Sequence, residues 1–184
     1  SIIGFEALVR WQHPTRGLLM PGEFITTAEA TGLIIPLGWW VLEEACRQMQ
    51  AWSLLYPAMA NLTMSVNMSS KQFSQQNLVE KVRDILMRTE FSPHRLALEV
   101  TEGVLINHSE SIMAILEQLR AMGIRLAVDD FGTGYSSLSY LHRFPFDCLK
   151  IDRSFIENAD QDFEKLEILQ SVVRLAWKIG RAHV

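Results

Sequence analysis

Two adjacent carboxylates, Asp129 and Asp130, are the residues of this sequence that most clearly suggest a reactive or ligand-binding site. They follow a mostly apolar run at 124–128, interrupted by Arg125, and precede a loop that contains Gly132 and Gly134. Side chains alternate across a strand, so both acids can reach one site only where the chain leaves extended geometry, which these glycines would permit. A solvated turn followed by a helix cap is the alternative interpretation, because Asp, Gly and Ser are common in turns and caps.

A third carboxylate, Glu6, lies in an apolar run at 2–11 that predicts a buried strand. A charged group in such a run needs a cation or a hydrogen-bond donor, because burying it alone is unfavourable. A salt bridge to Arg10 is the favoured interpretation, and a metal ion is the alternative.

Two further apolar runs carry polar groups at or near their ends. Asn67 lies at the end of the run 62–68, and Glu99 lies inside the run 96–101. The local alternatives are structural: Asn67 suits a helix cap, and Glu102 suits a solvent-facing acid in the first turn of a helix. Glu99 has no such simple alternative, because its flanking residues are apolar and predict burial.

The last strand-like run, 148–152, places Lys150 and Asp152 on one face, since they are two residues apart. Lys150 is flanked by Leu149 and Ile151. A lysine in this setting is costly to bury unless carboxylates lie nearby. The run therefore predicts an acidic environment around the amine.

Helical patterns separate these five strand-like runs. They fall at 23–31, 36–52, 78–86, 112–119, 137–141 and 163–177. Alternating strands and helices are typical of βαβ units and a parallel sheet, so the fold class is α/β. In such folds the carboxyl ends of the strands meet at one edge, where ligands bind, and the polar groups should converge there.

The converging groups offer oxygen ligands and no Cys or His. Carboxylates with an amide carbonyl suit Mg²⁺ or Mn²⁺ better than Zn²⁺. A central acid such as Asp129 could bridge two ions in a clamp for a phosphoester. Lys150 would then hold the attacking water or stabilise developing charge, and Arg10 could bind a phosphate oxygen. The residues thus predict a metal-dependent phosphoester hydrolase without naming its substrate.

Composition narrows the class of protein. The chain has 184 residues, suitable for one domain, and a net charge of −4, which argues against a nucleic-acid polymer as partner. Cys46 and Cys148 show no paired spacing and suit a reducing cytoplasmic compartment. The apolar segment 32–41 is too short to span a bilayer.

Five ordered motifs resemble the EAL domain family. They read EALVRW at 6–11, SVNMS at 65–69, LEVTE at 98–102, DDFGTGYSSL at 129–138 and KIDRSF at 150–155. The resemblance covers essentially the whole chain. It implies a TIM-type (β/α) barrel that hydrolyses cyclic-di-GMP to linear pGpG with two Mg²⁺ or Mn²⁺ ions.

The resemblance also implies roles for individual residues. Glu6, Asn67, Glu99 and Asp129 would bind the first metal, and Asp130 the second, with Asp129 shared. Lys150 would contact the water, so the catalytic group is Glu6, Asp129, Asp130 and Lys150. Leu8 and Arg10 would face the substrate, Glu102 would steady the loop after Asp130, and Asp152 belongs to its motif without a definite role.

The extent of the match leads to further expectations. Residues 1–178 would form a partial EAL domain with about five of the eight strands of a barrel, and 179–184 a non-native tail. Such a chain alone should show little turnover, and its open sheet edges should favour aggregation. The parent protein is expected to be a homodimer, with sensor or cyclase domains or a membrane tether as options. The alternative function is a non-catalytic cyclic-di-GMP receptor or interaction module of the same fold.

Overall fold

A computed structural model of the chain describes residues 2–107, 109–132 and 144–153, with short helical pieces at 166–167, 170 and 173–174. The predicted helix at 137–141, most of the helix at 163–177, Gly134 and the tail at 179–184 lie outside the described residues. None of the described helices is long and apolar enough to cross a membrane.

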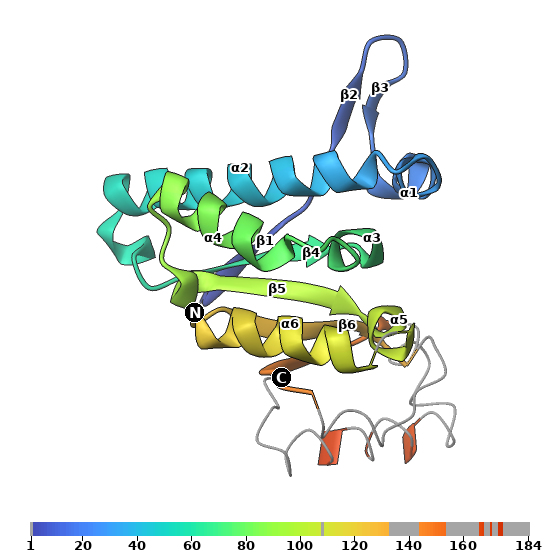
Figure 1. The fold of residues 1–184 in the computed structure, drawn as a ribbon. Helices are drawn as coiled ribbons and strands as arrows, with labels where there is room; N and C mark the ends of the chain where they lie inside the picture. Colours follow the sequence, from blue (N-terminus) through green and yellow to red (C-terminus); the bar gives the residue numbers. More distant parts are fainter. Residues whose placement is uncertain are drawn as a thin grey trace.

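Five parallel strands form one sheet that curves as a half-barrel (Figure 1). In sheet order they are β1 (Gly4–Ala7), β4 (Thr63–Met68), β5 (Leu96–Thr101), β6 (Arg125–Phe131) and β7 (Cys148–Ile151). The sheet order is also the chain order, as expected when each strand is followed by a helical crossover to its neighbour. The predicted α/β fold with about five barrel strands is therefore confirmed.

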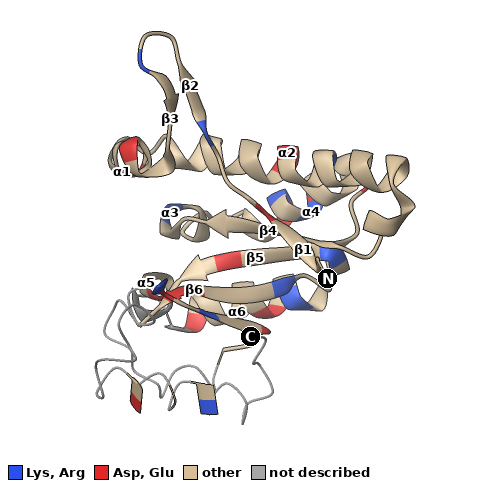
Figure 2. Ribbon diagram, turned by 180° about the vertical axis from the view of Figure 1, so that it is seen from behind, with Lys and Arg blue, Asp and Glu red and all other residues tan. Residues whose placement is uncertain are grey.

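Three long helices cover one face of this sheet: α2 (Ile34–Leu55), α4 (Leu78–Thr89) and α6 (Ser109–Ala121). The core lies between them and the strands, and it contains fully buried residues of α2 and of the three central strands, such as Leu42, Val66, Leu98 and Leu126. Alternation along each strand sends the intervening residues to the opposite face, which lies in front of the helices in Figure 2. That face carries the polar strand residues.

Short elements complete the described fold. They are α1 (Ile25–Thr31), α3 (Ser70–Phe73), α5 (Glu102–Asn107) and the 3₁₀ segments Pro21–Glu23, Pro57–Met59 and Pro93–Arg95. Left-handed glycines follow two of the helices, Gly32 after α1 with φ 80° and Gly123 after α6 with φ 93°. In both places the positive φ is the reason that glycine ends the helix.

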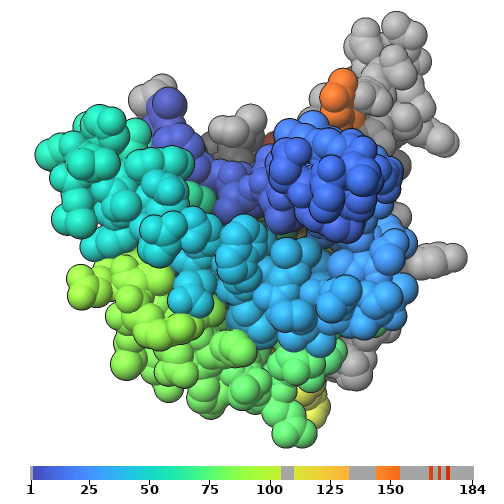
Figure 3. All heavy atoms as spheres, turned by 90° about the horizontal axis from the view of Figure 1, so that it is seen from above, coloured from blue at the N-terminus to red at the C-terminus, as the bar shows by residue number. Residues whose placement is uncertain are grey.

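The single buried strand predicted at 2–11 is wrong in extent and burial. Strand β1 spans only Gly4–Ala7, while Trp11–His13 forms β2 of a hairpin with β3, Gly17–Leu19. Ile2 and Ile3 are 70% and 78% exposed, because β1 is the outermost described strand on its side of the sheet. Figure 3 shows the hairpin as the dark blue mass beside the lighter blue surface of α2.

The predicted apolar stripe of α2 is also shifted. Helical spacing within 36–52 predicts an inward stripe of five residues, Leu37, Val41, Ala45, Met49 and Trp52. Ala45 and Met49 are buried as predicted, whereas Leu37, Val41 and Trp52 are only half-buried and Trp39, Leu42 and Cys46 are buried in addition. The helix packs against both β4 and α4, so the centre of its apolar face turns toward the gap between these two neighbours. A periodic pattern gives the width of such a face but not the direction in which it points.

Candidate metal centre at the carboxyl ends of the strands

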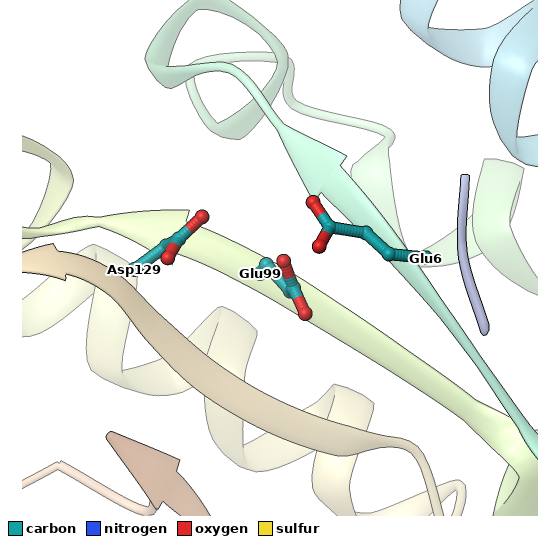
Figure 4. Close-up of side chains that lie close together, drawn as sticks. All are labelled: Glu6, Glu99 and Asp129. Atoms are coloured by element: carbon teal, nitrogen blue, oxygen red, sulfur yellow. The ribbon is translucent and has the colours of Figure 1, made fainter. Parts of the chain in front are cut away.

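Three carboxylates from three strands meet on the open face of the sheet. Glu6 of β1, Glu99 of β5 and Asp129 of β6 each offer an oxygen, and these oxygens lie within 4.8 Å of one another (Figure 4). The register explains the convergence. Asn67 pairs with Glu99 and Thr101 with Asp129, so the polar groups follow one another across adjacent strands. The predicted clustering at the strand ends is thus observed for these three acids.

The cation that faces Glu6 is not Arg10, and that predicted salt bridge is wrong. The Arg10 guanidinium donates to the carbonyl oxygen of Val9 at 2.8 Å, because the chain leaves the sheet after β1 and turns into the hairpin. The Glu6 carboxylate instead accepts from Nδ2 of Asn67 at 2.9 Å and from Nζ of Lys150 at 3.2 Å.

Glu99 is the buried member of the cluster, with 1% of its side chain exposed. Its Oε2 accepts from Lys150 Nζ at 2.6 Å, while Oε1 has no hydrogen-bond partner in the part of the chain that the structure describes. Burial raises the pKa of Glu99, and the nearby ammonium of Lys150 opposes that shift without cancelling it. A buried, unpartnered carboxylate oxygen beside two other carboxylates is an environment that fits a bound cation.

Lys150 lies between Glu6 and Glu99, as the apolar flanks of this lysine led us to expect. Burial alone would lower the pKa of Lys150, but the hydrogen bond to Glu99 and the charges of Glu99, Asp129 and Glu6 together raise it. The amine is therefore protonated at neutral pH and supplies the positive charge that the described cluster otherwise lacks.

Asp129 and Asp130 come together through an irregularity in β6. Asp130 has φ 52°, a left-handed conformation, and the pairing of β6 with β7 shifts between Val128 and Phe131. The break in alternation was predicted at the glycines, but it begins at Asp130 itself, with Gly132 following at φ 104°. Both acids belong to β6, which extends to Phe131, and a turn follows at Gly132; the predicted helix cap after it lies outside the described residues.

The charges around Asp130 show that it belongs to the same environment. Asp130 is exposed, but partial desolvation of its carboxyl group raises its pKa, and the neighbouring charges of Asp129 and Asp152 raise it further. Asp152 follows β7 and is half-buried, and its backbone N–H donates to the carbonyl of Phe131 at 3.4 Å. Several neighbouring carboxylates of like charge favour a bound cation.

Two local interpretations of polar residues fail in the structure. The cap of α3 is Ser69, whose hydroxyl accepts from the backbone N–H of Gln72 at 3.3 Å, so Asn67 is not the cap. Glu102 does open α5, but it is 7% exposed rather than solvent-facing. Its Oε2 accepts from the backbone N–H of Gly132 at 3.3 Å, which ties α5 to the segment after Asp130.

Leu8 and Arg10 are exposed between β1 and the hairpin. With Glu6 they line a groove of about 340 Å³ whose other wall is α2, including Trp40. Their contact with a substrate stays a prediction, as do the individual metal-binding roles of the acids and Asn67.

One residue on the face of the site was missed from the sequence. Thr101 ends β5 two positions after Glu99, so both side chains leave the same face of the strand. It pairs directly with Asp129 of β6 and is exposed. The alternation from Glu99 was the signal that could have identified it.

Comparisons with known proteins agree with this geometry. The family model that describes the sequences of EAL domains matches residues 1–184 of this chain. A curated relative from Pseudomonas aeruginosa, the bifunctional diguanylate cyclase/cyclic di-GMP phosphodiesterase MucR, is 48% identical over 174 residues, which cover 95% of this chain and 25% of the relative. The cyclic di-GMP phosphodiesterase PdeR of Escherichia coli is 40% identical over 182 residues, covering 99% of this chain and 26% of PdeR. The chain thus spans about a quarter of the length of these relatives.

Solved structures show the same arrangement. The chain matches a structure described as PaMucR phosphodiesterase in complex with c-di-GMP with a TM-score of 0.90 and 47% identity, over 97% of this chain and 72% of that one. The EAL enzyme Bd1971, in a form bound to cAMP and cyclic-di-GMP, matches with a TM-score of 0.88 and 32% identity, over 96% of this chain and 48% of that one. Motifs, half-barrel, acidic cluster and family match together show that this chain belongs to the EAL domain family.

Proposed function

We propose that this chain is the catalytic part of a phosphodiesterase that hydrolyses cyclic-di-GMP to linear pGpG. The observation that carries the proposal is the convergence of Glu6, Glu99 and Asp129 with a protonated Lys150 at the carboxyl ends of the strands. Membership of the EAL family and similarity to a structure in complex with c-di-GMP support this substrate.

The proposed cofactor is a pair of Mg²⁺ or Mn²⁺ ions. The donor set consists of oxygen atoms, and the unpartnered Oε1 of Glu99 gives one of them a clear need for a cation. One ion would be held by Glu6, Asn67, Glu99 and Asp129, and the second by Asp129 and Asp130. Divalent ions, when bound, supply Lewis-acid stabilisation of charge on the phosphate and a more acidic water nucleophile.

The chain's own residues contribute orientation and charge. Lys150 donates hydrogen bonds from the centre of the cluster, so it can orient the attacking water and stabilise negative charge on the phosphate. Arg10 offers a cationic fork for a phosphate oxygen, and Leu8 offers an apolar contact beside it. Glu102 holds the segment after Asp130 through Gly132 and thereby fixes the position of the second acid.

The proposal extends to the assembly. We infer a homodimer, and we infer sensor or cyclase domains in the protein that carries this chain, consistent with the bifunctional name of the MucR relative. Size-exclusion chromatography with light scattering tests the dimer directly.

The decisive experiment measures pGpG formation from cyclic-di-GMP by the protein that carries this chain, with Mg²⁺ or Mn²⁺. Glu6→Ala should abolish hydrolysis, while Glu80→Ala, at an exposed acid on α4, should leave the rate unchanged. Binding of cyclic-di-GMP without any hydrolysis by the unaltered protein would identify a receptor instead. Hydrolysis at the full rate by Glu6→Ala would refute the metal assignment.

A further inference from the structure

Thr101 offers the site a neutral hydrogen-bond donor. It is the last residue of β5, and it pairs with Asp129 in the register between β5 and β6. Its side chain is exposed, and its hydroxyl makes no hydrogen bond within the described part of the chain. A hydroxyl beside a cluster of acids is therefore available for a ligand.

Thr101 lies closer to the carboxyl edge of the sheet than Glu99 does. Along β5, Glu99 is buried at the level of Asn67, whereas Thr101 stands one step closer to the carboxyl edge, where the face opens to solvent. A ligand that enters from that edge reaches the level of Thr101 and Asp129 before that of Glu99. The residue is thus placed at the open edge of the site, where a substrate can contact it.

Charge explains why a hydroxyl is useful at this position. The neighbours of Thr101 on this edge are acids, Asp129 beside it and Asp130 next to that. Ionised carboxylates accept hydrogen bonds and donate none, so these acids offer no donor to the oxygens of a phosphodiester. A hydroxyl donates a hydrogen bond to a phosphate oxygen without adding charge, and hydrogen bonds to charged acceptors are stronger than neutral ones.

We propose that Thr101 Oγ1 donates a hydrogen bond to a non-bridging phosphate oxygen of the cyclic dinucleotide and so is a further substrate-binding residue of this site. The inference rests on the proposed function, since it takes the same substrate. It assigns to Thr101 a role that ordinary strand packing does not require, because the side chain is exposed at the strand end.

The test compares two substitutions that differ in the hydroxyl. Thr101→Val keeps the shape and β-branching of threonine but removes the donor, whereas Thr101→Ser keeps the donor and removes the methyl group. Binding of a non-hydrolysable phosphonate analogue of cyclic-di-GMP, in which a methylene group replaces a bridging ester oxygen and both non-bridging oxygens are kept, is measured by calorimetry with saturating Mn²⁺ in the protein that carries this chain. Mn²⁺ binding is followed separately by electron paramagnetic resonance of the free ion, and circular dichroism checks folding.

We expect Thr101→Val to bind the analogue about 10-fold more weakly, equivalent to about 1.4 kcal/mol, with unchanged Mn²⁺ affinity. Thr101→Ser should stay within about 2-fold of the unaltered protein. Equal analogue binding by Thr101→Val, or equal losses in both variants, would overturn the inference. A loss of Mn²⁺ affinity in Thr101→Val would also overturn it, since Thr101 would then act on the ion. Failure of the unaltered protein to bind the analogue would instead defeat the proposed function itself.

Discussion

In the protein without bound metal, Lys150 should stabilise the cluster of Glu6, Glu99 and Asp129. Its replacement should therefore lower the free energy of unfolding measurably. Replacement by Met keeps the length of the side chain but leaves Glu99, 1% exposed, without its 2.6 Å donor. Removing one partner of a buried ion pair costs about 3–5 kcal/mol. Lys150 is itself 34% exposed, so water can replace part of its contribution, and we expect about 3 kcal/mol, the lower end of that range.

The assay is thermal and urea unfolding of the chain without added metal. A loss of about 3 kcal/mol should lower Tm by roughly 6–12 °C for a domain of this size. The matched control is Lys71→Met, at an exposed lysine on α3, which should change stability by less than about 0.5 kcal/mol. The double variant Lys150→Met with Glu99→Gln should recover most of the loss, because no buried charge then remains unpaired.

The pH dependence of the Lys150→Met variant provides an independent check. Burial already raises the pKa of Glu99, and loss of the ammonium should raise it further. A carboxyl group whose pKa is higher in the folded state favours folding below its unfolded pKa and loses that contribution as the pH rises through the folded pKa. The loss of unfolding free energy in Lys150→Met, relative to the unaltered chain, should therefore be small near pH 4 and complete at pH 8. Unfolding curves for Lys150→Met that coincide with those of the unaltered chain at pH 8 would refute the reasoning.

Further predictions concern the alkaline limit, the break in β6 and the packing of α2. Because the folded-state pKa of Lys150 is raised, its contribution should be complete below pH 10.5 and disappear above that value, so alkaline unfolding should shift to lower pH in Lys150→Met. At Asp130, Asn tolerates a left-handed φ better than Ala does, so Asp130→Ala should lose about 1 kcal/mol more stability than Asp130→Asn, measured by urea unfolding. A Cβ on Gly38 would lie 2.3 Å from the buried Gln72 side chain, so Gly38→Ala should cost about 1–3 kcal/mol. Gly103→Ala, in α5 with nothing near its Cβ, should stabilise by about 0.5–1 kcal/mol, and equal effects of the two alanines on Tm would contradict this packing.

Short-range patterns in the sequence predicted the elements that hold the site. The run 96–101 was predicted as a strand with a buried acid, and β5 has those bounds with Glu99 buried. Lys150 was predicted to need carboxylates nearby, and it contacts two. These predictions succeed because burial alternates with a period of two along a strand, and because parallel strands bring their carboxyl ends to one edge.

Long-range partners and backbone torsions were not predictable in the same way. Arg10 was favoured as the partner of Glu6 because it is close in sequence, but the cation that reaches Glu6 is 144 positions away. The left-handed Asp130 and the burial of Glu102 depend equally on how β6 meets β7 and α5.

The sequence by itself therefore determined the kind of chemistry, because residue type and periodicity are local properties. These properties predicted oxygen ligands at the ends of parallel strands. The tertiary structure alone decided which groups meet. Strand register and one positive φ set the distances between Glu6, Lys150 and the two acids of β6, and such distances are fixed only when the whole sheet has formed.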